Sequence, residues 1–192
     1  MMTVQECETL AKKTLSAKRF THTINVRDMA VEFAKKHGVN VEKAEISALL
    51  HDIAKEKTKD EMLLIFKENA IMAKDFEKKL FPIWHGPCAA IVAMTELGIE
   101  DTEILNAISC HSSGRINMTK LDKVLYLADM VSAERDYEGV DELRKLALCD
   151  LDKGMETALE MNIGFIKEKG KIVDEESILT LKWLKESRKE NV

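Results

Sequence analysis

Glycine and proline are scarce in this chain of 192 residues, which contains eight glycines and two prolines. A β-sandwich or β-barrel uses many of both in its turns, so their scarcity argues against an all-β fold. Aromatic residues make up only 5% of the sequence, whereas Ala, Leu, Glu, Lys and Met, all good helix formers, are plentiful. The composition therefore favours an all-α fold, and the length suits a single domain.

Closely spaced cysteines and long apolar runs are also lacking. The four cysteines form no CxxC pair, which argues against a disulfide framework and against a zinc ribbon. We expect the cysteines to be reduced and mostly buried. The N-terminus has no apolar segment of the signal-peptide kind, and no run of about 18 apolar residues occurs. These absences predict a cytoplasmic protein with no contact to the membrane.

An excess of positive charge is absent too, because the formal net charge is −5. Proteins that bind duplex DNA or RNA present a basic face, so no binding to duplex nucleic acid is expected. Small anionic ligands remain compatible with this balance, since a few local cations suffice to bind them.

Apolar residues recur at helical spacing along nearly the whole chain, and no internal repeat is visible. Asn40 and Asp101 are expected N-caps, and Gly38 is expected just beyond the end of a helix. Residues 112–115 form a predicted loop, and residues 170–173 a turn or a short strand. Helices are expected over 3–15, 21–37, 40–55, 58–67, 74–80, 85–98, 101–111, 119–131, 141–149, 150–168 and 175–188.

The adjacent pair His51 and Asp52 is the sharpest local signal for chemistry. An imidazole and a carboxylate together make a mixed nitrogen and oxygen site for a divalent transition metal. Asp129 falls on the apolar stripe of its predicted helix. A carboxylate that faces the core must be paired, hydrogen-bonded or metal-bound, because its burial is otherwise expensive.

Three other histidines share this inward placement. His22 and His85 are expected at the starts of helices, and His111 at the end of one, each aimed at the interior. His37 is the exception, because its position beside Gly38 predicts a helix C-terminus, where its cationic form is favoured. Four inward histidines with two inward carboxylates indicate one shared site.

The ordered pattern H…HD…H…H…D resembles that of the HD-domain phosphohydrolase superfamily. The segments RFTHTINV, LLHDIAKE, IWHGPCAA, AISCHSSGRINM and LDKVLYLADMVSAER resemble the YqeK family of symmetrical bis(5′-nucleosyl)-tetraphosphatases over roughly residues 15–150. CHSSG departs from the usual His-Thr-Thr-Gly of that family, although serine keeps the hydroxyl groups. The resemblance implies an all-α HD-domain bundle with a metal site between helices. Residues 1–192 would form this single domain, with the helices of 151–192 packed on the core.

The resemblance also implies the roles of the site residues. A divalent transition metal would be held by His22, His51, Asp52 and Asp129. Iron is the implied native ion, and the ligand chemistry also allows manganese, cobalt, nickel or zinc. The implied contacts to the substrate are Arg19, His22, His85, His111 and Arg135, and the implied catalytic residues are Asp52, Lys55 and His111. For Lys55, the sequence leaves open a second interpretation as a solvated lysine at a helix end.

The implied reaction is the hydrolysis of diadenosine tetraphosphate to two ADP by attack of metal-activated water on an inner phosphorus. The expected partners are a dinucleoside polyphosphate and its ADP or GDP product, and a homodimer stays open. His85 and His111 are expected to bind the phosphates or a second metal, because the first site already has four protein ligands. Two alternatives remain, namely another HD-type hydrolase of nucleoside monophosphates or cyclic nucleotides, and a non-catalytic nucleotide-binding module.

Overall fold

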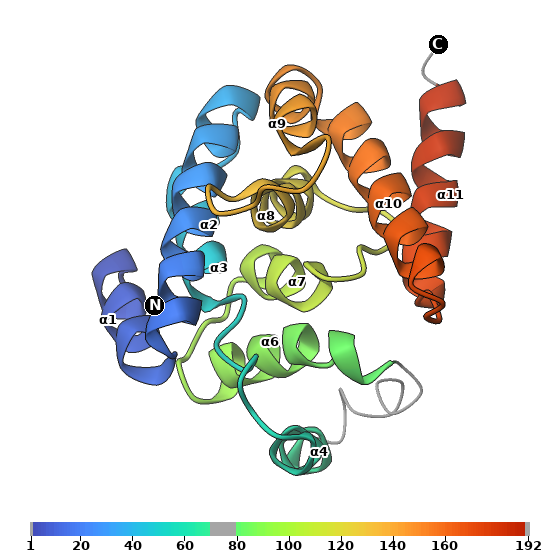
Figure 1. Cartoon of the computed structure of the whole chain (residues 1–192). Helices are drawn as coiled ribbons and strands as arrows, with labels where there is room; N and C mark the ends of the chain where they lie inside the picture. Colours follow the sequence, from blue (N-terminus) through green and yellow to red (C-terminus); the bar gives the residue numbers. More distant parts are fainter. Residues whose placement is uncertain (1, 70–79, 191–192) are drawn as a thin grey trace.

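The computed structural model describes residues 2–69 and 80–190, and every regular element in these residues is a helix (Figure 1). The all-α prediction is therefore confirmed. The α-helices are α1 Val4–Thr14, α2 Ala17–His37, α3 Val41–Leu50, α4 Lys59–Glu68, α6 His85–Thr95, α7 Thr102–Cys110, α8 Lys120–Val131, α9 Val140–Cys149, α10 Leu151–Glu168 and α11 Glu175–Glu190, and a 3₁₀ helix spans Phe81–Ile83.

Helices α7 and α8 lie at the centre of the fold (Figure 1). Helix α8 packs against α2, α3, α7, α9 and α10, and α7 also contacts α3 and α6. Helix α10 packs on α8 and α9, and α11 packs on α10. The expectation that residues 1–192 form one domain stays a prediction, although these contacts join the C-terminal helices to the core.

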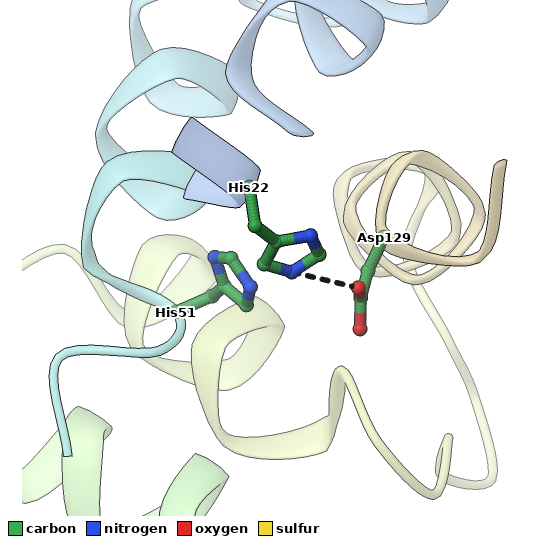
Figure 2. A group of neighbouring side chains, drawn as sticks. All are labelled: His22, His51 and Asp129. Carbon is green, nitrogen blue, oxygen red and sulfur yellow. Dashed lines mark ion pairs between the residues drawn. The ribbon is translucent and has the colours of Figure 1, made fainter. Parts of the chain in front are cut away.

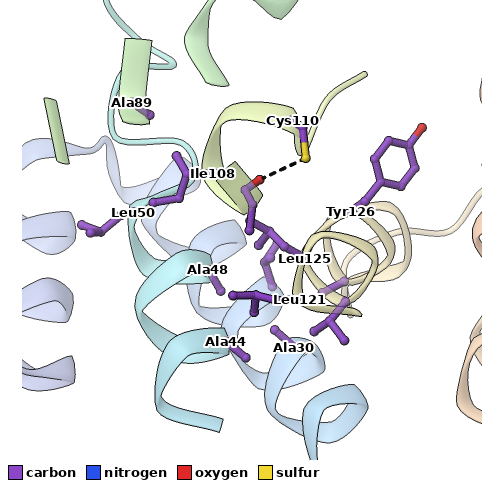
Figure 3. Close-up of a cluster of buried hydrophobic side chains, with 14 of the residues drawn as sticks. Ala30, Ala44, Ala48, Leu50, Ala89, Ile108, Cys110, Leu121, Leu125 and Tyr126 are labelled. Carbon is purple, nitrogen blue, oxygen red and sulfur yellow. Dashed lines mark hydrogen bonds between the residues drawn. The ribbon is translucent and has the colours of Figure 1, made fainter. Parts of the chain in front are cut away.

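The core between these helices combines small and large apolar side chains (Figure 3). Three small side chains are fully buried, namely Ala30 on α2 and Ala44 and Ala48 on α3. The larger side chains of Ile108 on α7 and Leu125 on α8 are also buried. Alanine side chains let neighbouring helix axes approach, while the branched side chains fill the space that remains. This close packing fixes the helix ends that carry the polar residues described below.

The helix boundaries largely follow the local signals in the sequence. Asn40 caps α3 through a bond from the Lys43 amide, and Asp101 caps α7. Gly38 ends α2 in the left-handed conformation with φ 67°, which glycine adopts without steric penalty. These three predictions are confirmed.

The predicted continuation of α3 to residue 55 is wrong, because the helix ends at Leu50. Residues 51–56 form tight turns, in which the Ile53 amide bonds to the Leu50 carbonyl (3.2 Å) and the Lys55 amide to the Asp52 carbonyl (2.8 Å). These i to i−3 bonds turn the chain more sharply than an α-helix does. His51 and Asp52 therefore leave the helix at its end.

Two further expectations need correction. Helix α2 begins at Ala17, with Ser16 as its N-cap, so His22 lies in the second turn and not at the helix start. Residues 171–174 form no strand and follow a turn at Gly170, so the turn interpretation of this segment holds. The helix expected over 74–80 lies outside the described residues except for Leu80.

Two ion pairs involve charged side chains outside the cluster of histidines and aspartates. Arg115 pairs with the fully buried Asp122 (2.6 Å), and Lys123 pairs with Asp152 (2.6 Å). Cys149 is exposed, and Cys7, Cys88 and Cys110 are buried free thiols.

Among residues 2–69 and 80–190, no helix combines the length and the apolar character that crossing a bilayer requires.

Candidate metal and phosphate site

The inward histidines and aspartates come from five helices and meet near the middle of the fold. His22 lies on α2 and Asp129 on α8, while His51 and Asp52 follow α3, His85 begins α6 and His111 follows α7. Figure 2 shows the side chains of His22 on α2, His51 just after α3 and Asp129 on α8 directed toward one another.

Three of the histidines are oriented by the same local device, a hydrogen bond to the carbonyl three residues earlier. The Nδ1 atom of His51 donates to the Ala48 carbonyl (2.7 Å), that of His85 to the Pro82 carbonyl (2.9 Å), and that of His111 to the Ile108 carbonyl (2.7 Å). Carbonyls at helix ends lack their usual amide partners, which makes them available to the imidazoles. A carbonyl oxygen can only accept, so Nδ1 carries the proton and Nε2 presents its lone pair to the site.

His22 is held differently, because its Nδ1 donates to a carboxylate oxygen of Glu134. Asn25 donates to the other oxygen of that carboxylate (2.7 Å), and the Ser132 hydroxyl donates to the first (2.8 Å). Carboxylate partners of this kind orient metal-binding histidines and raise their basicity. Sequence reasoning missed Glu134, although its place beside Arg135 in the polar segment after α8 was a usable signal.

The atoms that converge on the site lack other partners. Among the described residues, His22 Nε2, His51 Nε2 and Asp52 Oδ1 are buried and accept or donate no hydrogen bond. Such atoms are costly in a folded protein unless an ion or water satisfies them. These unsatisfied nitrogen and oxygen atoms therefore fit a divalent metal ion as their missing partner.

The spacing of the donor atoms agrees with such an ion. His22 Nε2 lies 3.2 Å from Asp129 Oδ1, and Asp52 Oδ2 lies 3.7 Å from His22 Nε2 and 3.4 Å from His51 Nε2. Adjacent ligands on an ion with bonds of about 2.1 Å are about 3 Å apart when they subtend a right angle. The donor atoms of His22, His51 and Asp129 all lie within 4.8 Å of one another.

Asp52 lies between two groups of side chains. Its Oδ2 faces His22 and His51 and also accepts from Arg19 Nη1 (2.8 Å). Its Oδ1 lies 3.4 Å from His85 Nε2 and 3.7 Å from His111 Nε2. The Asp52 carboxylate therefore faces both groups of imidazoles, and it could coordinate one cation through each oxygen.

The second group consists of His85 and His111 with two donors. Their Nε2 atoms are 3.0 Å apart, and Ser112 Oγ lies 3.0 Å from the first and 3.1 Å from the second. Lys55 Nζ lies 3.1 Å from His85 Nε2. Because both Nδ1 protons are used by carbonyls, these Nε2 atoms act as acceptors, and the position between them favours a cation or a donor. Ser112 is a second residue that sequence reasoning missed.

Electrostatics favour ionised carboxylates and a neutral His111. Burial raises the pKa of Asp52, but His51, His111 and His85 lower it by more, so it lies well below its usual range. Burial likewise raises the pKa of Asp129, while the proximity of His22, whose Nε2 lies 3.2 Å away, and of the other imidazoles lowers it overall. Burial, then the proximity of His51, lowers the pKa of His111 to about 4. Near neutral pH the carboxylates are ionised and His111 is neutral.

Cationic side chains border the site on its open side. Arg135 contacts Asp129 through Nη2 (2.8 Å), and its Nε bonds to the Asp129 carbonyl (3.1 Å). The side chains of Arg19 and Arg135 are 31% and 40% exposed, so both can exchange partners. Both arginines line a cavity of 490 Å³, together with Lys18, Thr21, His22 and Glu134. The cavity can accept an anion against two guanidinium groups.

The structure thus brings together every site residue that the sequence singled out, in two neighbouring groups. His22 and His51 face Asp52 and Asp129, while His85, His111 and Lys55 lie on the other side of Asp52. Arg19 and Arg135, expected on phosphates, are paired with the two aspartates.

Comparison with known proteins was consistent across sequence and structure. The HD domain family matches residues 19–134. The symmetrical bis(5′-nucleosyl)-tetraphosphatase of Bacillus subtilis is 37% identical, over 95% of this chain and 98% of that protein. The protein of the same name from Halalkalibacterium halodurans is 34% identical, over 89% and 91%. A crystal structure from Clostridium acetobutylicum, described as a predicted HD superfamily hydrolase involved in NAD metabolism, superposes with a TM-score of 0.91 and 31% identity, over 97% and 99% of the two chains.

Proposed function

The chain belongs to the HD-domain family, among the symmetrical bis(5′-nucleosyl)-tetraphosphatases, and we propose that it hydrolyses diadenosine tetraphosphate to two ADP. The observation that carries the proposal is a set of buried atoms without a hydrogen bond, His22 Nε2, His51 Nε2 and Asp52 Oδ1, beside a cavity lined by two arginines. Metal-dependent hydrolysis of a polyphosphate needs both features, namely a site for the ion and cations for the substrate.

The first ion would be held by His22, His51, Asp52 and Asp129. We propose Fe²⁺ for this position, since two imidazoles with carboxylate oxygens suit that ion, and Mn²⁺, Co²⁺, Ni²⁺ and Zn²⁺ share the same ligand preferences. Arg19 and Arg135 now pair with the two aspartates. With an ion held by those carboxylates, Arg19 and Arg135 would lose these ion pairs and would be available to bind phosphate.

A second cation would lie between His85 and His111. The two Nε2 lone pairs face each other at 3.0 Å, and Asp52 Oδ1 lies 3.4 Å from the first. Lone pairs at this distance repel unless a cation or a donor lies between them. Lys55 and Ser112 are the donors now closest to these atoms. With a divalent ion held there, the Lys55 ammonium group would be available to bind the substrate.

The side chains divide the work of the reaction among them. Bound divalent ions supply Lewis-acid chemistry, by lowering the pKa of water and polarising phosphoryl oxygens. Asp129 borders a cavity of 230 Å³ together with His111 and Ser112, and it accepts a hydrogen bond from the attacking water, which orients the water toward an inner phosphorus. Arg19, Arg135 and Lys55 neutralise the charge that develops on the phosphoryl oxygens and on the departing ADP. The bond between the two inner phosphates breaks, so each product retains two phosphates.

Product identity in ¹⁸O-labelled water tests this function. The protein loaded with Fe²⁺ under anaerobic conditions, or with Mn²⁺, should convert diadenosine tetraphosphate to two ADP, one of which carries the label. Release of AMP and ATP would contradict symmetrical cleavage. Turnover that survives complete removal of metal would contradict the metal-dependent mechanism.

The variant His111→Ala tests the proposed second position. We expect the variant to retain the ion on His22 and His51, to lose the second ion, and to turn over at least about tenfold more slowly, as loss of transition-state charge stabilisation predicts. Metal content per chain measures this directly. His37→Ala is the matched control, because His37 lies at the end of α2 and contacts the Ala147 carbonyl (2.7 Å). Wild-type metal content in His111→Ala would exclude this position.

A further inference from the structure

The segment between α8 and α9, residues 132–139, carries two side chains on which the site depends. We call it the α8–α9 loop. The Glu134 carboxylate accepts from His22 Nδ1, and Arg135 Nη2 donates to Asp129 Oδ1 (2.8 Å). Loops are more mobile than the helices that they connect. A fixed orientation of Glu134 and Arg135 therefore needs an anchor outside the loop.

Arg144 on α9 provides that anchor. Its Nε donates to the Val131 carbonyl (2.7 Å), and its Nη2 donates to the carbonyls of Ser132 (2.9 Å) and Arg135 (2.8 Å). Its Nη1 donates to Asp141 Oδ1 (2.5 Å), which holds the guanidinium group in place. One side chain therefore bonds to three backbone carbonyls, one at the end of α8 and two in the α8–α9 loop.

The shape of the guanidinium group suits these bonds. Arginine presents five donors in a planar fork, and the carbonyls at a helix end lack their usual amide partners. The Ser132 carbonyl also accepts from the Arg135 amide (2.9 Å), which closes the loop into a turn. Glu134 lies within this turn, between the two loop carbonyls that Arg144 holds. Lysine has the same charge, but its donors share a single nitrogen, so it cannot reproduce the fork.

The position of Arg144 is fixed by the packing of α9. The neighbouring side chains of Leu143 and Ala147 are buried, and α9 packs against α8 and α10. A helix held in this way moves less than a surface loop. The hydrogen bonds from Arg144 therefore tie the α8–α9 loop to the core of the fold.

Arg144 lies outside the site itself. Among the described residues, it lines neither the cavity of 490 Å³ beside Arg19 nor the cavity of 230 Å³ beside His111. Its hydrogen bonds go to Asp141 and to backbone carbonyls. An effect of this residue on the bound metal or on phosphate must therefore pass through the loop.

We propose that Arg144 is a positioning residue for the reaction, and that it acts through two side chains of the α8–α9 loop. It holds Glu134 toward His22, which orients that imidazole for metal, and it holds Arg135 toward the phosphates. The reaction rests on the proposed function, whereas binding of metal and of phosphate can each be measured without turnover.

Two variants of Arg144 test this role against two controls. Arg144→Lys keeps the charge and removes the fork, and Arg144→Gln keeps one donor group and removes the charge. Arg27→Lys is the matched control, because the Arg27 side chain is 20% exposed, as against 21% for Arg144, and pairs with Glu8 and Asp28. Asp141→Asn is the second control, since it removes the ion pair at Nη1 and leaves the three carbonyl bonds.

Chelator competition measures the step that passes through Glu134. Arg144→Lys should weaken metal binding by about tenfold, the lower end of the range for a lost partner of a metal-binding histidine. In the Glu134→Gln background the same change should weaken it by less than about twofold, because residues that act through one another have non-additive effects. Both controls should bind metal as the wild type does. Equal losses in the two backgrounds would overturn the proposal.

Binding of inorganic pyrophosphate at saturating metal measures the step that passes through Arg135. Arg144→Lys should weaken this binding by about fivefold or more, and by less than about twofold when Arg135→Ala is already present. Arg27→Lys and Asp141→Asn should leave it unchanged. Wild-type affinity for pyrophosphate in Arg144→Lys would remove Arg135 from the proposal and so overturn it.

The melting temperature and circular dichroism separate this role from a purely structural one. Arg144→Gln takes the place of Arg144→Lys in the same measurements if the lysine variant is not folded at the assay temperature. A lowered melting temperature with wild-type affinities for metal and pyrophosphate would show that Arg144 only stabilises the fold, and would overturn the proposal. If diadenosine tetraphosphate is not cleaved while both affinities follow the expectation, the proposed function fails and the positioning role stands.

Discussion

Glu134 supplies the sharpest test of how the site is organised, because it acts through His22. Its carboxylate accepts from His22 Nδ1, from Asn25 (2.7 Å) and from Ser132 (2.8 Å). The variant Glu134→Gln keeps an acceptor oxygen and removes the negative charge that makes the imidazole a stronger ligand. Loss of such a partner weakens metal binding by about 10- to 100-fold, which corresponds to about 1.4–2.7 kcal/mol. The Glu134 side chain is 37% exposed, so the melting temperature should change little.

Competition with a chelator of graded affinity measures the metal dissociation constant of the variant and of the wild type. Asp136→Asn is the matched control, because it removes one negative charge from an exposed residue two positions along the same loop. The control should bind metal as the wild type does. Unchanged affinity in Glu134→Gln would refute the orienting role, and an equal loss in both variants would show an effect of overall charge.

The remaining predictions separate function from stability. Arg135→Ala should reduce turnover by about 10- to 100-fold through loss of about 1.5–3 kcal/mol of contacts to charged oxygens, with little change in melting temperature. Arg115→Ala should do the reverse, lowering the free energy of unfolding by about 1–3 kcal/mol, because it leaves the buried Asp122 without its ion pair. Gly154→Ala should destabilise by about 1–3 kcal/mol in urea titrations, since the new Cβ would lie 2.9 Å from a backbone atom of α9. Gly164→Ala, with open space around its Cβ, should raise the free energy of unfolding by about 0.5–1 kcal/mol. A stabilised Gly154→Ala or a destabilised Gly164→Ala would contradict the packing argument.

Local patterns in the sequence determined the secondary structure and most of the helix boundaries. The N-caps at Asn40 and Asp101 and the left-handed Gly38 follow from interactions within a few residues, so they can be predicted without the fold. The inward position of Asp129 follows from helical periodicity in the same way. The end of α3 could not be predicted, because apolar periodicity continues to Ile53 and Ala54, and the turns form where the chain meets other helices.

The grouping of the site residues was decided by the tertiary structure alone. The sequence placed His22, His51, His85 and His111 inward, but it could not show that Asp52 faces all four imidazoles. Glu134 and Ser112 take their roles from partners on other segments, His22 and His85, more than 25 residues away. Sequence periodicity records which face of a helix is buried, whereas distances between side chains on different helices depend on how those helices pack.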